Sequence, residues 1–371
     1  MLLVVTVVFL FVYALLISFY FYHWLRTKEF TPKTEASTFV SVVIAARNEE
    51  DNISSLLEAL SNQTYSKDFF EVIVVDDFST DKTVEKLTPF LSDRIRLIQP
   101  EVNITESSKK KAIETGIKRA KGKLIVVTDA DCIPKKEWLF LMSAFQQKNN
   151  AVFIAAPVKL KTYPSLLSIF QSLDFITLQG ITAASVKANV HSMCSGANLA
   201  YIRSVFFDVG GFAGIDKLAS GDDMLLMYKV WKKYPKKVHY LKNKNAIIET
   251  EPMHTWKSFF QQRKRWSSKA TYYKDWRITL VLLFVYVFNL YFLVLLAFGI
   301  YESQYLITLF LYLLGKTIIE IPMVYSVAKF YSQQKLIAYF PFLQPLHIMY
   351  TVAIGLISQF GSYQWKGRKT N

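Results

Sequence analysis

The chain has 371 residues, of which 52% are hydrophobic and 15% aromatic, and it carries a formal net charge of +15. This composition is too apolar for an ordinary soluble domain, and with only 13 Gly and 11 Pro it excludes a collagen-like, low-complexity or disordered chain. The length allows one large water-soluble domain together with several membrane spans. The two cysteines, Cys132 and Cys194, are too few for a disulfide framework and favour a reducing, cytoplasmic environment.

The first segment, residues 1–25, contains no Asp, Glu, Lys or Arg and exceeds the roughly 20 apolar residues that a spanning helix requires. It ends in aromatic residues and lacks the basic start and cleavage site of a signal peptide, so we expect a retained transmembrane anchor. Arg26, Lys28 and Lys33 follow directly. The positive-inside rule therefore predicts that the chain after the anchor is cytoplasmic.

Residues 38–253 are predicted to form an α/β domain on a mainly parallel sheet, because short apolar runs alternate with helix-patterned segments. The runs are rich in Val, Ile and Leu, which is typical of strands covered on both faces. The predicted strands are residues 39–45, 71–75, 95–98 and 124–128, and the predicted helices are residues 52–60, 82–91 and 108–120.

Acidic residues follow two of these strands at their carboxyl ends, where ligands of open α/β sheets usually bind. Asp76 and Asp77 close the second predicted strand, and capping of the next helix is the structural alternative for one of them. Asp129 and Asp131 close the fourth. In an extended chain, side chains at i and i+2 point the same way, so these two carboxylates can face one hard divalent cation.

A third acidic pair, Asp222 and Asp223, precedes a predicted helix. Capping of that helix by Asp222 is the structural interpretation. In the functional interpretation, one carboxylate has an orienting role and the other acts as general base toward a hydroxyl. The residues by themselves leave both open.

Residues 254–272 are predicted to form an amphipathic helix at the membrane interface. Gln262, Arg265 and Trp266 stand at helical positions i, i+3 and i+4 and so form one patch. The patch either anchors the helix at the membrane surface or stabilises a departing diphosphate beside an aromatic platform for a sugar ring.

Three further apolar segments complete the chain. Residues 278–301 and 307–327 are predicted transmembrane helices joined by a short outer turn. In the second of them, Lys316 and Glu320 stand at i and i+4, as a structural ion pair between packed helices or as a polar pair lining an acceptor path. Residues 336–365 contain two prolines and are predicted to be either a transmembrane or a re-entrant segment.

Three basic clusters contribute to the net charge. No recognised nucleic-acid-binding module accompanies them, so nucleic acid is not expected as a partner. Attraction to anionic membrane lipids and to a phosphorylated substrate explains the charge more simply, and solvated surface is the simpler interpretation of the first two clusters. The clusters are Lys109, Lys110 and Lys111; Lys232, Lys233, Lys236 and Lys237; and Arg263, Lys264 and Arg265.

Seven short motifs occur in order along the chain. They are Ala46-Arg47-Asn48-Glu49-Glu50, Val75-Asp76-Asp77-Phe78-Ser79-Thr80-Asp81, Asp129-Ala130-Asp131, Ser195-Gly196-Ala197-Asn198, Gly210-Gly211-Phe212, Gly221-Asp222-Asp223 and Gln262-Arg263-Lys264-Arg265-Trp266. In this order they resemble the family 2 glycosyltransferases, and most of all the membrane-integrated branch that includes cellulose, hyaluronan and ceramide-glucosyl synthases. The chain departs from the family pattern at Asp222, where Glu is common, and at Ala45, where Pro is common.

The resemblance implies a GT-A (Rossmann-like) fold, a nucleoside-diphosphate sugar as donor, most often UDP-linked, and Mg²⁺ or Mn²⁺ as cofactor. It also implies a role for each matching residue. Asn48, Glu49, Asp76 and Asp77 would line the nucleotide site, Asp129 and Asp131 would hold the metal and diphosphate, Asp223 would be the catalytic base with Asp222 beside it, and Gln262, Arg265 and Trp266 would bound the diphosphate and the acceptor end.

The expected function is that of a multi-pass cell-membrane enzyme, an inverting glycosyltransferase acting on a lipid or short glycan acceptor at the cytoplasmic face. A processive polysaccharide synthase is the alternative, although about four spans make a polymer channel harder to build from this chain alone. A catalytically inactive membrane scaffold with the same domain would predict lost carboxylates. All four candidate sites are intact in the sequence.

Overall fold

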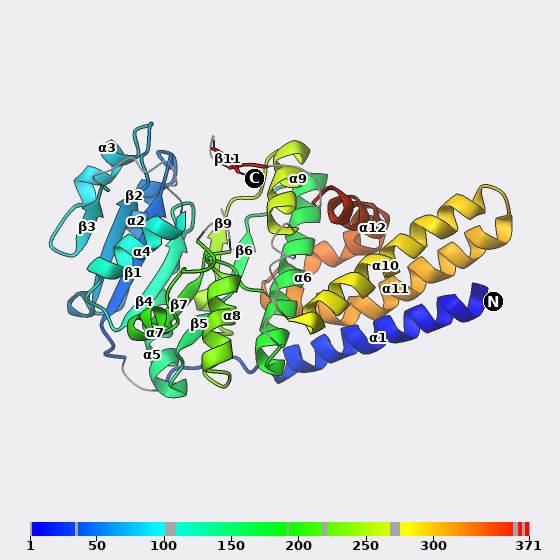
Figure 1. The fold of residues 1–371 in the computed structure, drawn as a ribbon, viewed down its shortest axis with the longest axis horizontal. Helices are drawn as coiled ribbons and strands as arrows, with labels where there is room; N and C mark the ends of the chain where they lie inside the picture. Colours follow the sequence, from blue (N-terminus) through cyan, green and yellow to red (C-terminus); the bar gives the residue numbers. More distant parts are fainter. Residues whose placement is uncertain are drawn as a thin grey trace. The chain divides into compact units, whose positions relative to one another are not determined.

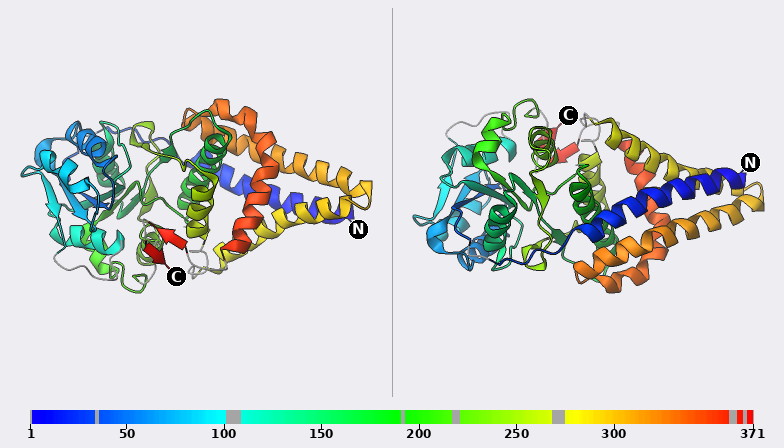
Figure 2. Two further views of the ribbon diagram at one scale, coloured as in Figure 1. Left: turned by 90° about the horizontal axis from the view of Figure 1, so that it is seen from above. Right: turned by 90° about the horizontal axis from the view of Figure 1, so that it is seen from below.

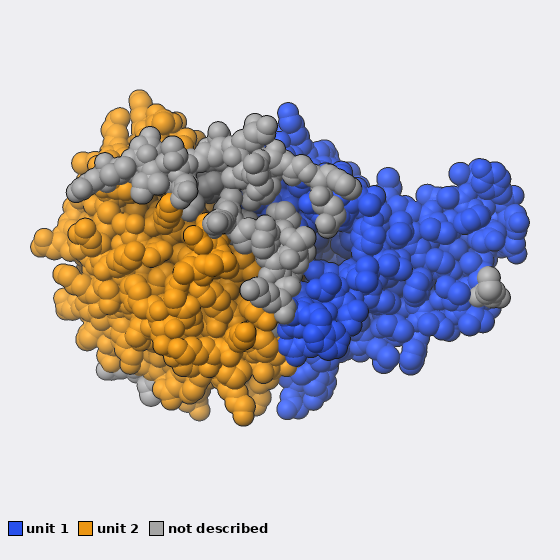
Figure 3. All heavy atoms as spheres, in the orientation of Figure 1, with its two compact units in different colours: residues 1–26, 162–184, 252–371 blue, residues 27–161, 185–251 orange. Residues whose placement is uncertain are grey.

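A computed structural model describes residues 2–33, 36–100, 109–190, 193–216, 221–267, 275–358, 363–365 and 368–370. The chain forms two compact units, coloured separately in Figure 3. Unit 1 comprises residues 1–26, 162–184 and 252–371, and unit 2 comprises residues 27–161 and 185–251. Parts of three predicted membrane segments lie outside the described residues: Met1, residues 268–272 and residues 359–362.

Unit 2 is an α/β domain on a seven-stranded mixed sheet (Figure 1). Its strands are β1 (Val40–Ala46), β2 (Phe70–Asp76), β3 (Ile95–Ile98), β4 (Leu124–Asp129), β5 (Phe153–Ala155), β7 (Leu199–Ile202) and β8 (Val238–Tyr240). The order is β3-β2-β1-β4-β7-β5-β8, and β7 runs antiparallel to both of its neighbours. The predicted α/β fold is confirmed, with one reversed strand in the mainly parallel sheet. A separate parallel pair joins β6 (Val158–Leu160) to β9 (Ile248–Thr250).

Strand pairing brings the candidate site residues of unit 2 to one edge of this sheet. Ala46 at the end of β1 lies opposite Asp76, and Ala45 lies opposite Asp129, because the three strands are parallel. The reversed strand β7 begins at Leu199 beside the end of β4. The acidic ends of β2 and β4 and the segment that leads into β7 therefore share the carboxyl edge.

The helices of unit 2 connect these strands, as expected for βαβ units. A Cβ on Gly116 of α4 would come within 2.5 Å of Val43 Cγ1, which shows how closely this helix packs on β1. The helix predicted at 82–91 is interrupted, because Pro89 has no N–H to continue the α-helical hydrogen bonds. The helices are α2 (Ile53–Ser61), α3 (Thr83–Leu87), α4 (Lys109–Arg119), α5 (Trp138–Asn149), α7 (Arg203–Asp208) and α8 (Met224–Lys233), with short 3-10 turns at Lys67–Phe69, Thr88–Phe90 and Lys244–Ala246.

Unit 1 is mainly helical. Its elements are α1 (Leu2–Arg26), most of α6 (Leu166–Ala188), α9 (Trp256–Ser267), α10 (Trp276–Gly299), α11 (Ser303–Phe330), a 3-10 turn (Gln334–Tyr339), α12 (Phe340–Ile357) and the hairpin β10 (Tyr363–Trp365) and β11 (Arg368–Thr370). Figure 2 shows α1, α10 and α11 side by side, with α12 crossing α10.

Among the described residues, five helical segments are long and apolar enough to cross a membrane: α1, α6, α10, α11 and residues 334–357. Four of them correspond to the segments predicted from the sequence. The fifth, α6, lies within the range predicted as the α/β domain, but its first part belongs to unit 1. Most of the residues in the apolar stretch of α6 are buried, whereas fewer than a third are buried in each of the other four.

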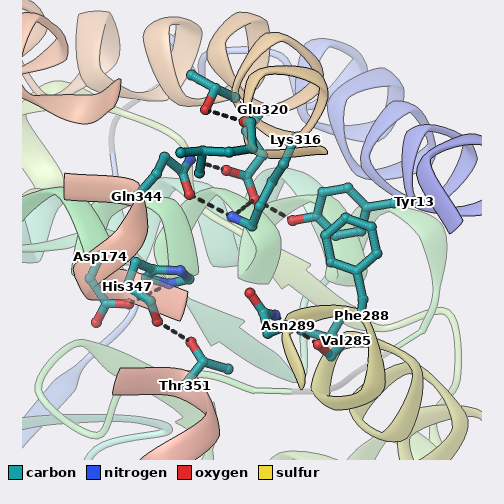
Figure 4. A network of polar contacts seen from close by, with 12 residues as sticks. Tyr13, Asp174, Val285, Phe288, Asn289, Lys316, Glu320, Gln344, His347 and Thr351 are labelled. Atoms are coloured by element: carbon teal, nitrogen blue, oxygen red, sulfur yellow. Dashed lines mark hydrogen bonds and ion pairs between the residues drawn. The ribbon is translucent and has the colours of Figure 1, made fainter. Parts of the chain in front are cut away.

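A buried polar network joins three helices of unit 1 (Figure 4). Lys316 Nζ on α11 lies 2.7 Å from Glu320 Oε1 and 2.7 Å from Gln344 Oε1 on α12. Tyr13 of α1 and Gln344 both donate hydrogen bonds to the Glu320 carboxylate. This geometry matches the structural interpretation of the Lys316 and Glu320 pair, because the two charges pair with each other and accept or donate further hydrogen bonds within the helix bundle.

A buried amide fixes the start of β7 in unit 2. Asn198 is fully buried, and its Oδ1 accepts a hydrogen bond from Trp138 Nε1 at 2.9 Å. Its Nδ2 donates to the carbonyl oxygens of Pro157 and Ala246, both at 2.8 Å. One side chain thus satisfies a buried indole and two buried carbonyls, so Asn198 of the fourth motif holds the sheet edge in place.

Lys316→Met should lower the thermal unfolding temperature in detergent, because the Glu320 carboxylate then stays buried without its ammonium partner. Removing one partner of a buried pair typically costs about 3–5 kcal/mol. Adding Glu320→Gln should recover part of that loss, since the charge without a counterion is gone. Near-ultraviolet circular dichroism measures both transitions, and equal losses in the single and double variants would contradict a charged pair.

Asn198→Ala should lower the free energy of unfolding by about 3 kcal/mol or more, since each buried polar group left unsatisfied costs about 1–3 kcal/mol. The matched control is Asn245→Ala, which truncates an exposed asparagine that bonds to Glu137. The control should stay within about 0.5 kcal/mol of the native protein. Thermal unfolding in the same detergent compares the two, and similar losses would argue against the buried amide as an anchor.

Candidate active site

Two carboxylates and one thiol meet at the end of β4. The ligand atoms of Asp129, Asp131 and Cys132 all lie within 4.8 Å of one another. Burial raises the pKa of the Cys132 thiol, and the Asp131 and Asp129 carboxylates raise it further. A protonated thiol is a poor ligand, whereas carboxylate oxygens are the ligands that Mg²⁺ and Mn²⁺ prefer. The donor set therefore suits a hard divalent cation held by the two carboxylates.

Lys109 joins this group to the acidic pair before α8. Its Nζ lies 2.5 Å from Asp129 Oδ1 and 3.1 Å from Asp222 Oδ2, and the side chain is largely buried. Burial alone would lower the pKa of Lys109, but the carboxylates of Asp129, Asp222 and Asp223 raise it above its ordinary value. The ammonium is therefore charged at neutral pH and links acidic residues that lie far apart in the sequence.

Asp223 is tied to the backbone on two sides. Its Oδ1 accepts a hydrogen bond from Met224 N at 2.7 Å, and its Oδ2 accepts one from Gly196 N at 3.3 Å. The helix begins at Met224, so the capping residue is Asp223, and the expectation that Asp222 caps it is wrong by one residue. A Cβ on Gly196, in the segment before β7, would lie 3.2 Å from Lys109 Nζ, so a glycine at this position leaves room for the lysine to reach the carboxylates.

The loops after β1 and β2 hold a second polar group at the same sheet edge. Thr80 N donates to Asn48 Oδ1 at 2.9 Å, and Asn48 N donates to Ser79 Oγ at 3.0 Å. Ser79 N in turn donates to the Asp76 carboxylate at 3.3 Å. Asn48 has a φ of 52°, in the left-handed region where asparagine is tolerated better than most residues. The polar groups of Asn48 and Asp76 thus help to shape these loops.

Glu49 and Asp77 complete this group. Asn52 Nδ2 donates to Glu49 Oε2 at 2.9 Å, and Glu49 N donates to Thr83 Oγ1 at 2.8 Å. Asp77 is buried, and its backbone oxygen accepts a hydrogen bond from Arg47 Nη1 at 2.6 Å. The residues predicted to line the nucleotide site are therefore held in a rigid pair of loops.

Gln262, Arg265 and Trp266 lie on α9 in unit 1, whereas the other predicted site residues lie in unit 2. All three side chains are partly exposed. The residue between them in the motif, Arg263, is buried, and its guanidinium lies 4.2 Å from the centre of the Trp266 ring.

Sequence reasoning missed the first basic cluster. The interpretation of Lys109 and Lys110 as solvated surface is wrong, because Lys110 is buried and the Lys109 side chain, 18% exposed, pairs with Asp129 and Asp222 within unit 2. Lys110 Nζ donates to the backbone oxygen of Ile215 at 2.5 Å. The available signal was position: a helix that follows a parallel strand starts at the carboxyl edge, so its first residues face the site. The second cluster, Lys232, Lys233, Lys236 and Lys237, is exposed as predicted.

The chain is similar in sequence to known glycosyltransferases. Residues 41–210 match the family model described as glycosyl transferase family 2. The chain is 30% identical over 239 residues to the probable glycosyltransferase YdaM of Bacillus subtilis, covering 63% of this chain and 55% of that protein. It is 30% identical over 193 residues to the glycosyltransferase AglE of Haloferax volcanii, covering 52% of this chain and 60% of that protein. The chain thus spans little more than half the length of these curated relatives.

The fold is also similar to a solved structure, the mannosyltransferase PcManGT from Pyrobaculum calidifontis in complex with GDP-Man and Mn²⁺. The TM-score is 0.57 at 18% identity, and the match covers 97% of this chain and 99% of that one. At this identity the likeness concerns the fold, which is that of GT-A enzymes. Residues 41–210 of the chain are thus similar to family 2 glycosyltransferases.

Proposed function

We propose that this protein is a membrane-bound inverting glycosyltransferase that moves a sugar from a nucleoside-diphosphate sugar, UDP-linked, to a lipid or short glycan acceptor at the cytoplasmic face. One observation carries the proposal. Asp129, Asp222 and Asp223 surround the Lys109 ammonium at the carboxyl edge of the sheet, where ligands of such sheets bind, and Asp131 lies beside Asp129. The match of residues 41–210 to glycosyl transferase family 2 supports sugar transfer as the reaction at this cluster.

Asp129 and Asp131 would hold Mg²⁺ or Mn²⁺, and the Mn²⁺ in the PcManGT complex supports a divalent cation. When bound, the cation would supply positive charge to the diphosphate and so stabilise it as a leaving group. Lys109 adds a fixed positive charge from the protein itself. The loops that carry Asn48, Glu49, Asp76 and Asp77 would line the nucleotide, since they end at the same sheet edge.

Asp223 is the proposed catalytic base, with Asp222 held beside it by Lys109. Its carboxylate takes the proton of the acceptor hydroxyl as that oxygen attacks the anomeric carbon from the face opposite the diphosphate. The bond between the anomeric carbon and the diphosphate oxygen breaks, and the nucleoside diphosphate leaves with the bonding electrons. One displacement of this kind inverts the anomeric configuration.

The membrane part of the proposal is supported by unit 1. Its outer surface is apolar, and basic residues follow α1, so the positive-inside rule predicts a cytoplasmic catalytic domain. The N-terminal end of α1 lies at the same end of the bundle as the turn between α10 and α11, as expected if both face the outside (Figure 2). The crossing of α12 over α10 favours a re-entrant or interfacial segment for residues 336–365. Membrane lipids would then surround an acceptor that α9 meets through Gln262, Arg265 and Trp266.

Purified protein in detergent with membrane lipids and Mn²⁺ should release nucleoside diphosphate from one member of a panel of UDP- and GDP-sugars. Asp223→Ala should lower kcat by about 100-fold or more, the usual contribution of a general base. Asp131→Ala should abolish metal-dependent turnover, and so should a chelator. Asp208→Ala is the matched control, because this aspartate is exposed and pairs with Lys233 on the surface.

The size of the product and the turnover of the variants together test the proposal. A single sugar on a lipid or short glycan would support it, and a long polymer would favour the processive alternative instead. Unchanged turnover in both Asp131→Ala and Asp223→Ala would contradict the assigned roles. Donor binding without turnover in the native protein would favour an inactive scaffold.

Lys109→Met should raise the KM for the donor by at least about tenfold, because a hydrogen bond to a charged group contributes about 1.5–3 kcal/mol. The raised pKa keeps this ammonium charged, so the ratio of KM values should stay constant between about pH 6 and 9. Lys118→Met is the control, since Lys118 is exposed on the same helix and pairs with Glu114. Initial rates over a donor series measure the effect, and a lower kcat at unchanged KM would argue against a donor contact.

A further inference from the structure

Arg263 is the least exposed residue of its motif, although it carries a full charge. It is 1% exposed, and its guanidinium lies between the rings of Phe259 at 5.0 Å and Trp266 at 4.2 Å. Its Nη2 lies 2.8 Å from Asp174 Oδ2 on α6, and both side chains of this pair are buried. A charge in such surroundings requires a counterion, because desolvating an unpaired ion is costly. Asp174 provides that counterion.

The same aspartate reaches a third helix. Asp174 Oδ1 lies 3.6 Å from His347 Nε2 on α12, and Figure 4 shows the two side chains facing each other. Around this polar centre the rings of Phe170 on α6, Phe259 on α9 and Tyr350 on α12 contact one another, with centroids 5.3 to 5.8 Å apart. Helices α6, α9 and α12 therefore meet at one joint, which we call the Asp174 joint.

Helix geometry connects this joint to the patch on α9. At 3.6 residues per turn, Phe259 and Arg263 share the buried face, and Trp266, Gln262 and Arg265 follow in that order around one side of the helix. A slip of one residue at the joint would turn this patch by about 100°. It would also separate Arg263 from Asp174 and leave two buried charges unpaired. The ion pair thus selects one rotation of α9.

We propose that the buried ion pair between Arg263 and Asp174 is a positioning device that fixes the rotation of α9 and so presents Gln262, Arg265 and Trp266 as one face. Arg263 and Asp174 act through that face and do not touch the substrate. The role rests on the proposed function, because the face is expected to bound the diphosphate and the acceptor end. His347 supports the aspartate from α12.

The decisive variant is Asp174→Asn, which keeps the shape of the side chain and removes its charge. The full-length protein is labelled with 5-fluorotryptophan, and the Trp266 resonance is assigned by its absence in Trp266→Phe. Asp174→Asn and Arg263→Met should both shift or broaden this resonance, whereas Arg263→Lys should restore it in part. Lys257→Met is the matched control, because Lys257 is an exposed cation on the same helix. It should leave the resonance unchanged.

Turnover provides a second readout. With the donor found in the panel, Asp174→Asn should lower kcat/KM by about 10- to 100-fold, the scale expected for a misplaced binding group. If Asp174→Asn does not fold, the double variant Asp174→Asn with Arg263→Gln takes its place, since it buries no unpaired charge. The double variant should fold and still show the shifted Trp266 resonance and the reduced turnover.

A native Trp266 resonance with native kinetics in either folded variant would overturn the positioning role. If the native protein turns over no donor, the proposed function fails, and the resonance still tests the positioning role by itself. A shifted resonance with native kinetics would overturn the link between the rotation of α9 and catalysis. A shift together with slower turnover supports the proposal in full.

Discussion

The candidate site depends on the ion pairs that the Lys109 ammonium forms with Asp129 and Asp222. Parallel strands bring Asp129 to the carboxyl edge, and the chain before α8 brings Asp222 and Asp223 to the same place. Carboxylates this close repel one another unless a cation lies between them. Lys109 supplies that cation from the first turn of α4, so the acidic cluster is stable as part of the fold.

Unit 1 also contains buried cations that are paired with carboxylates. The buried Lys316 and Arg263 each have an acidic partner, Glu320 and Asp174. The first pair ties α11 to α1 and α12 through Tyr13 and Gln344, and the second ties α9 to α6. A buried charge whose partner moves away is left without water or a counterion, so such pairs specify which helices meet and in which rotation. Aromatic contacts alone would tolerate more than one arrangement.

The sequence predicted the four strands β1 to β4 within one residue at each end, because runs of Val, Ile and Leu bounded by polar residues carry a strong signal. Strand-end acids such as Asp129 were recognisable for the same reason. Lys109 was not, because a run of three lysines looks like solvated surface until the start of α4 is placed at the sheet edge. The helix α6 was missed because residues such as Gln171 and Asp174 dilute its apolar signal, and their partners, the backbone of Met253 and the side chain of Arg263, are known only from the tertiary structure.

Some motif residues are explained by their structural role in the fold, whereas others are explained only by a chemical role. The Asn198 amide satisfies three buried partners, so the stability of the fold is sufficient to explain its presence. Asp129 pairs with Lys109, and Asp131 adds a second partly exposed carboxylate close to it. Carboxylates held close together repel each other, so packing alone does not explain the second one. The presence of Asp131 beside Asp129 and Lys109 therefore supports the proposed transferase activity more strongly than the intact motif order does.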